Sequence, residues 1–316
     1  MKDLIDRINS TFLTRTEDLS LQREIWRDLA NQFRPEISQY RTARPSTLIA
    51  RETGDMGLAV LWIVESMLVR PILKDISLAA DITENISGIL STVGTDSICA
   101  LANSENPAEP VVYEERNGKI IFSGEKKFIT AGANADLIIV TCRRPGEEKV
   151  SGVALVGRKS LPEGSLIDLN LNIFRSVSHT KLIINGFQPD NEIIPALDPS
   201  VLRRSLKKWG IIERALIMES FISFLIYAGR LFASKNIIIP ETEKLMDIQD
   251  LQTESANKQL DEALYGKIIE TKNADAAGVF SITGRFKEKF SEHNEKFSEE
   301  ERIKLSDLSL FDNLKG

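Results

Sequence analysis

The sequence contains very little cysteine and histidine. Its 316 residues include two cysteines, Cys99 and Cys142, and two histidines, His179 and His293. Two thiols exclude a disulfide framework, and so few ligands of these types form no metal-binding motif, so we expect no metal site. The first residues, MKDLIDRINSTFL, lack the uncharged apolar core of a signal peptide. Together with the few cysteines, this predicts a cytoplasmic location.

An excess of positive charge and a long hydrophobic run are also missing. The chain carries 40 Lys and Arg against 46 Asp and Glu, a formal net charge of -6. Without a basic field, nucleic acid and anionic lipid are not expected as partners, and a small ligand is favoured. The longest apolar run, Met56–Val69, has 14 residues and contains Glu65. It is too short to cross a bilayer, so we predict a buried helix and no membrane span.

The hydrophobic pattern changes twice along the chain. Residues 1–96 show helical spacing, as in Leu4, Ile8 and Phe12, residues 97–196 carry short β-type runs, and residues 197–316 return to helix. These boundaries predict an N-terminal helical domain, a central antiparallel β-domain and a C-terminal helical bundle, an α+β fold.

The central region has short β-type runs separated by turn residues, as is typical of an all-β unit. Its five main β-type runs cover residues 111–116, 119–124, 137–142, 152–157 and 181–185. Asn117-Gly118 lies between the first two and supplies the two positive φ angles of a type I′ turn, which predicts a hairpin. Short strands at this spacing favour an antiparallel barrel or sandwich.

Two features of the last region concern packing. The motif EKFSE occurs twice, seven residues apart, and predicts one helix with Phe286, Phe290 and Phe297 along a single stripe. That helix covers either its own domain or a partner. The stretch 215–229 is apolar almost all round, which together with the phenylalanines predicts an oligomer.

Three stretches of the central region resemble the acyl-CoA dehydrogenase family. GKIIFSGEKKFITAGANADLIIV, residues 118–140, is similar to the family's hairpin of the form G-x-x-x-x-G-x-K-x-[WF]-I-[TS]-x-G-x-x-A-D. ICALANSEN, residues 98–106, resembles a strand that ends in Thr-Glu-Pro in the family. FRSVSHTKLIINGFQPDNEIIP, residues 174–195, resembles the closing strand. The order of helical, β and helical regions agrees with the family.

The resemblance implies an activity and a cofactor. Members of the family carry out flavin-dependent α,β-dehydrogenation of an acyl thioester, bound to coenzyme A or an acyl carrier protein, with FAD. They pass electrons to an acceptor such as an electron-transfer flavoprotein. By resemblance, Phe128 would lie at the isoalloxazine ring, the Thr130 hydroxyl near its N5, and Ser104 at its pyrimidine side. Arg230 resembles an arginine that reaches the FAD pyrophosphate of a neighbouring subunit.

The same reaction requires a carboxylate that removes the α-proton. Most family members place it in a C-terminal E-G-[TS] segment, which this sequence lacks, and a minority place it directly before an Arg on the first helix of the last domain. Glu213 precedes Arg214 in the corresponding region. The resemblance therefore implies Glu213 as the catalytic base, whereas a salt-bridged surface glutamate is the alternative.

The sequence also departs from the family pattern. NPAEPVV replaces the family's Gly-Ser-Asp segment after Ser104-Glu105, Ser234 replaces a glycine after Arg230, and the Gly-rich segment of the late helices survives at most around Gly284. These departures leave a second hypothesis open. In it, the protein is a catalytically degenerate subunit that acts as a structural or heteromeric partner of a fuller paralogue.

Overall fold

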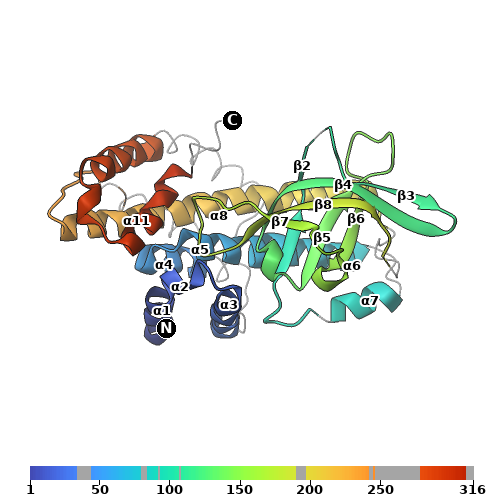
Figure 1. The fold of residues 1–316 in the computed structure, drawn as a ribbon, viewed down its shortest axis with the longest axis horizontal. Coiled ribbons are helices and arrows are strands. Elements are labelled where there is room, and N and C mark those ends of the chain that lie inside the picture. Colours follow the sequence, from blue (N-terminus) through green and yellow to red (C-terminus); the bar gives the residue numbers. More distant parts are fainter. Residues whose placement is uncertain are drawn as a thin grey trace.

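The computed structural model describes residues 1–33, 44–79, 84–91, 93–106, 108–189, 197–241, 245 and 278–310. Helices precede and follow a block of strands (Figure 1). The first helices are α1 (Lys2–Ser10), α2 (Phe12–Arg15), α3 (Leu19–Phe33), α4 (Arg44–Thr53), α5 (Met56–Ile63), the π-helical turn η2 (Val64–Val69), α6 (Arg70–Ala79) and α7 (Glu84–Ser91). The strands are β1 (Cys99–Ala102), β2 (Ser104–Glu105), β3 (Val112–Arg116), β4 (Lys119–Thr130), β5 (Leu137–Cys142), β6 (Gly152–Gly157), β7 (Leu166–Asp168) and β8 (His179–Phe187). The later helices are α8 (Pro199–Ser234), the helical residues 278–292 and α11 (Glu299–Leu305). Short 3-10 turns are η3 (Gly132–Asn134), η4 (Arg158–Ser160), η5 (Asn294–Lys296) and η6 (Ser306–Ser309).

The predicted fold class is confirmed, with strands between two helical regions. In the first region, the apolar residues at helical spacing face the interior, because Leu4, Ile8 and Phe12 are all buried. The boundaries after residues 96 and 196 stay predictions.

The strands form two sheets. One has the order β1-β5-β6, and the other has the order β2-β4-β8-β7 with β3 beside β4. All pairs in the second sheet are antiparallel, as expected. In the first sheet, however, β1 and β5 run parallel, with Cys99 opposite Leu137 and Ala102 opposite Val140. The expectation of a purely antiparallel domain is therefore wrong for this pair. Because β2, β3 and β4 intervene in the other sheet, the chain returns to β1 by a long connection, which permits a parallel pair.

Strand β5 separates two hydrophobic cores. All six of its residues are buried. Leu137 and Ile139 join the core formed with the helices, whereas Ile138 and Val140 join the core between the two sheets. Covered on both faces, the strand has no polar alternation, which explains its continuous apolar sequence.

The Asn117-Gly118 hairpin is confirmed. Asn117 has φ 55° and Gly118 has φ 73°, and the turn pairs β3 with β4 from Arg116–Lys119 outward. The second expected hairpin, between β4 and β5, does not form. Strand β4 continues through Thr130, and after η3 the chain enters the other sheet. The segment resembling the family motif, residues 118–140, thus contains the whole 12-residue strand β4, a crossover between the sheets and most of β5.

Two helices are longer than the apolar run suggested. Met56–Ala79 is continuous through α5, η2 and α6, and both it and Pro199–Ser234 are long and apolar enough to cross a membrane by length and composition. The 14-residue length of the apolar run therefore does not exclude a membrane-spanning helix. In the most apolar 18-residue stretch of each helix, 89% of Met56–Ala79 and 56% of Pro199–Ser234 is buried inside the protein. Core helices of water-soluble proteins also pass this test, so length and composition are weak evidence for a membrane span.

The phenylalanines of the last region cover their own domain. Phe232 of α8 lies 5.3 Å from Phe286 and 4.9 Å from Phe297, measured between ring centroids, and Phe290 lies 5.4 Å from Phe297. The single-helix prediction is wrong. Helical residues end at 292, and Ser298 caps the separate α11 with a capping box completed by Glu301. Because these rings are covered within the chain, they no longer support an oligomer.

Candidate functional site

The outer face of the second sheet brings three of the predicted site residues together. Ser104 of β2 is the cross-strand partner of Phe128 on β4, and Thr130 is the partner of His179 on β8. Ser104 is exposed, Phe128 is 38% exposed and Thr130 is buried. Ile129, between the two β4 side chains, points into the core between the sheets. This alternation directs Phe128 and Thr130 away from that core, to one common face.

His179 completes this face and was not predicted from the sequence. Its ring centroid lies 5.0 Å from that of Phe128 and 5.9 Å from that of Phe174. The residue is 4% exposed, and neither ring nitrogen forms a hydrogen bond of normal geometry with a described residue. Burial lowers the pKa of His179 to about 4, and the Asp168 carboxylate and the Phe174 backbone offset this only in part. The imidazole is therefore neutral at physiological pH.

The turn after β4 is closely packed against β8. Ala131 has a φ of 60°, and its amide donates to the carbonyl of Ser178 at 2.7 Å. A Cβ atom on Gly132 would lie 2.1 Å from Thr180 Oγ1, so only glycine fits here. The hydroxyls of Ser178 and Thr180 are buried and have no partner within the described chain. Ser178, just before β8, and His179 and Thr180, its first two residues, thus carry polar atoms without a hydrogen bond of normal geometry to the described chain.

The loop behind His179 is anchored by buried carboxylates from both helical regions. Phe174 has a left-handed φ of 54°, and its amide donates to Asp307 Oδ1 at 2.7 Å. Ser176 donates to Asp55, the N-cap of α5, which also pairs with Arg15 at 2.6 Å. Burial raises the pKa of Asp307 well above its usual range. These contacts hold the rear wall of the site in place.

A buried ion pair fixes β2 against β4. Lys126 Nζ donates to Glu105 Oε2 at 2.5 Å and to Thr141 Oγ1 at 3.0 Å. Burial lowers the pKa of Lys126, and Glu105 opposes this shift. The pair holds the two-residue strand that presents Ser104. The nearby Cys142 thiol, whose pKa burial raises to about 12, is protonated and no nucleophile.

Glu213 lies elsewhere, on α8. This helix runs along most of the long axis of the molecule (Figure 1), packs against α4, α5 and α6 and touches β6. Glu213 and its neighbours Ile212 and Leu216 are partly buried. Burial raises the pKa of Glu213 to about 7, and Arg214 opposes this. No hydrogen bond or ion pair joins Glu213 to the described residues around Phe128.

Arg230 lies further along α8 and is engaged within its own chain. It donates to the carbonyl of Arg51 and pairs with Glu52 at 3.5 Å, both at the end of α4. Its side chain is 53% exposed. Part of the guanidinium is thus accessible to solvent, but it is already paired with the Glu52 carboxylate. A role in cofactor binding stays a prediction.

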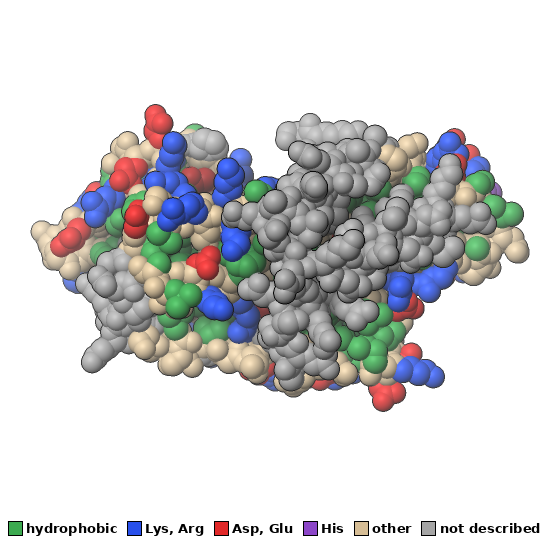
Figure 2. Space-filling model, turned by 180° about the vertical axis from the view of Figure 1, so that it is seen from behind, with side chains coloured by type: hydrophobic (Ala, Val, Ile, Leu, Met, Phe, Trp, Pro, Cys, Tyr) green, Lys and Arg blue, Asp and Glu red, His purple; other side chains and the backbone are tan. Residues whose placement is uncertain are grey.

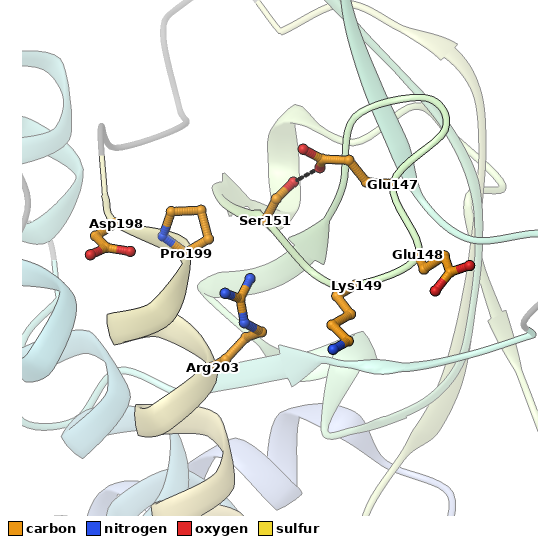
Figure 3. A pocket seen from close by; sticks show the side chains of 7 residues that line it. All are labelled: Glu147, Glu148, Lys149, Ser151, Asp198, Pro199 and Arg203. Atoms are coloured by element: carbon orange, nitrogen blue, oxygen red, sulfur yellow. Dashed lines mark hydrogen bonds between the residues drawn. The ribbon is translucent and has the colours of Figure 1, made fainter.

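One shallow surface depression contains none of these residues. It has a volume of about 430 Å³ and lies between the β5–β6 loop and the start of α8 (Figure 3). Arg203 and Lys149 face it together with Glu147, Glu148 and Asp198, so the charges of its lining nearly balance. Ser151 donates to Glu147, and Arg203 donates to the Val150 carbonyl at 3.1 Å.

Other signals of function are weak in the described part of the chain. Its His, Cys, Asp and Glu side chains form no cluster able to hold a metal ion. On the face seen in Figure 2, acidic and basic side chains are interspersed over the described residues.

No protein-family model matches the sequence, and no curated protein matches it. Solved structures do match. Butyryl-CoA dehydrogenase from Megasphaera elsdenii superposes with a TM-score of 0.69 at 14% identity, over 100% of this chain and 91% of that one. The chain has the acyl-CoA dehydrogenase fold.

Two further structures support this assignment. A putative acyl-CoA dehydrogenase from Mycobacterium smegmatis gives a TM-score of 0.70 at 11% identity, over 100% of this chain and 92% of that one. The FAD complex of PigA gives 0.63 at 12% identity, over 99% and 94%. The fold predicted from three sequence motifs is therefore confirmed, whereas the identities are too low to carry over any residue's role.

Proposed function

We propose that the protein is a flavin-dependent dehydrogenase that binds FAD against the outer face of β4 and β8. The observation that carries this proposal is the meeting of Ser104, Phe128 and Thr130 on one face of an acyl-CoA dehydrogenase fold. They come from two separate motifs, and the fold places them side by side.

The residues of this face fit a planar ring with polar edges. Phe128 offers a partly exposed aromatic surface, Ser104 lies opposite it on β2, and Thr130 follows two residues along β4. The buried ring nitrogens of His179 make no hydrogen bond of normal geometry with the described chain. When bound, FAD supplies the acceptor for the two electrons that leave with the substrate's β-hydrogen. The aromatic wall excludes water, and the Thr130 hydroxyl orients the ring.

The proposed substrate is an acyl thioester, oxidised between its α and β carbons, and Glu213 is the proposed base. A general base works best with a pKa near the operating pH, and the pKa of about 7 meets this condition. In this mechanism the Glu213 carboxylate removes the α-proton and becomes a carboxylic acid. An acceptor such as an electron-transfer flavoprotein then takes the electrons.

The absorption spectrum of the purified protein tests this proposal. We expect flavin bands in protein purified with added FAD, and anaerobic addition of butyryl-CoA or longer acyl-CoA thioesters should bleach them. Bound flavin that no thioester of any chain length bleaches would contradict the dehydrogenase assignment. Absence of flavin binding would contradict the cofactor assignment as well.

A degenerate partner subunit is the second candidate function. The pairing of Arg230 with Glu52 and the Arg51 carbonyl favours it, because an arginine held this way is less available to a pyrophosphate. In this case the chain purifies without flavin, and flavin binding appears only when a fuller paralogue is co-expressed with it.

We further propose a cytoplasmic, oligomeric protein, as a homo-oligomer or a heteromer with such a paralogue. Support comes from residues 211–219 of α8, which are mostly apolar and only partly buried. Light scattering at micromolar concentration should give a mass of at least twice 35.4 kDa. A value near 35.4 kDa would contradict the oligomer.

A further inference from the structure

The imidazole of His179 is held in an unusual environment for a polar ring. It is 4% exposed and lies between the rings of Phe128 and Phe174. Neither nitrogen makes a hydrogen bond of normal geometry in the described chain, although the backbone of Phe174 lies close enough to oppose the lowering of the pKa. A buried polar group without a hydrogen bond is unfavourable, and each such group in a folded protein calls for an explanation.

Core packing does not explain this histidine. The next residues of β8 that point between the sheets are Leu182 and Ile184, both apolar and buried. Because side chains alternate along a strand, His179 points to the opposite face, beside Thr130 and Phe128. An apolar residue would fill the same space without unpaired nitrogens. Packing alone therefore does not require a histidine at position 179.

The ring also has little freedom to turn towards another partner. Phe174 packs behind it, and its left-handed backbone is held by the hydrogen bond to Asp307 from the C-terminal region. A loop fixed in this way holds the imidazole against the face that carries Phe128. Preorganised polar groups of this kind are typical of binding sites.

We propose that His179 is a ligand-binding residue that donates or accepts a hydrogen bond at the polar edge of a flavin ring lying against Phe128. The inference rests on the proposed function, because it names FAD as the ligand. A neutral imidazole has one donor and one acceptor, and the edge of an isoalloxazine ring offers carbonyl acceptors and an N–H donor. The two sets of groups are complementary.

The electrostatics of the site agree with a neutral ring. Burial lowers the pKa of His179 to about 4, and the carboxylate of Asp168, paired with the neighbouring Thr180 across β7 and β8, is the charged group that opposes the shift. The hydrogen-bonding state is therefore constant from about pH 5 upward. Flavin affinity should not change with the titration of this ring between pH 6 and 9.

The first test uses the wild-type protein. It contains two histidines, His179 and His293, so imidazole 15N resonances can be assigned by comparison with a single variant. On titration with FAD, the nitrogens of His179 should shift to values of hydrogen-bonded imidazole, while those of His293, which follows the helical residues 278–292, should not. FAD binding that leaves the His179 resonances unchanged would overturn the inference and leave the proposed function standing.

The second test compares His179→Leu, His179→Asn and the control His293→Leu. We expect His179→Leu to weaken FAD binding about threefold to tenfold, as for a lost hydrogen bond to an uncharged partner, and to move the flavin absorption maxima. His179→Asn should restore part of both effects, because an amide keeps a donor and an acceptor. Equal affinity and spectra in folded His179→Leu protein would overturn the inference. If the wild type binds no FAD, the proposed function fails with it.

Discussion

The face formed by β4 and β8 and the helix α8 both carry sequence-predicted site residues, but they differ in how those residues are held. On the sheet, Ser104 and Phe128 are cross-strand partners, and Thr130 follows on the same face. On α8, Glu213 and Arg230 are 17 positions apart, and Arg230 is engaged by residues of α4. A strand motif fixes the relative positions of its side chains through pairing. A helix motif leaves that relation to tertiary packing.

Glu213 gives the largest expected effect and tests the helix side of this comparison. Glu213→Gln should leave flavin binding intact and slow flavin bleaching by acyl thioester about 10²-fold to 10⁴-fold, the range for loss of a general base. In the wild type, bleaching should become faster as the pH rises through about 7, because only the deprotonated carboxylate accepts the α-proton. Stopped-flow absorbance measures both.

The control for this variant is Glu219→Gln, six residues further along α8 and on another side of the helix. It should bleach at the wild-type rate. An unchanged rate in Glu213→Gln would remove Glu213 from the mechanism and confine the functional residues to the sheet face.

His179 gives a large effect on stability at acid pH. Its folded pKa of about 4 lies below the usual 6.5, so the unfolded state takes up a proton first as the pH falls. The associated stability is present above pH 6.5 and is lost as the pH falls towards 4, by about 3 kcal/mol in total. Urea unfolding of wild type and His179→Asn between pH 7 and pH 4 should show the smaller loss in the variant, with His293→Asn as control.

Thr130 tests the sheet face directly. Thr130→Val keeps the shape and removes the hydroxyl, so we expect flavin affinity to fall about tenfold or less, as for one hydrogen bond to an uncharged partner. Bound flavin is measured by fluorescence quenching. Thr14→Val, at an exposed position in α2, is the control. If flavin content and reduction rate stay at wild-type values in Thr130→Val, this face is not where the ring lies.

Arg230 gives the smallest expected effect. Because it is paired with Glu52 and more than half exposed, Arg230→Gln should change the free energy of unfolding by about 0 to 1 kcal/mol. Its loss of flavin affinity should be smaller than that of Thr130→Val. A larger loss would show that the guanidinium leaves Glu52 to bind phosphate, and α8 would then belong to the cofactor site.

Local chemistry made several features predictable. The Asn117-Gly118 turn depends on positive φ angles within two residues, and the alternation around Ile129 directs Phe128 and Thr130 to one face. The order of helical and β regions follows from hydrophobic spacing, which each segment carries on its own. The family motifs then led to the fold that the solved structures confirm.

Other features depended on contacts between distant segments. The parallel pairing of β1 with β5, the crossover after Thr130 and the break between Phe290 and Phe297 result from which surfaces the chain can bury together. A register between paired residues 38 positions apart, as for Cys99 and Leu137, leaves no local signal because its free energy comes from sheet and core packing.

The candidate site also combines features set by the local sequence with features set by tertiary packing. The sequence contains the residue types at 104, 128 and 130 and their alternation along a strand, and these sufficed to predict the face on which a flavin would lie. His179 came to light only in the folded chain, because its significance lies in what surrounds it: two aromatic rings, a loop held by Asp307, and no hydrogen bond of normal geometry to either nitrogen from the described chain. Burial and an unmet hydrogen bond are properties of an environment, and tertiary packing alone creates that environment.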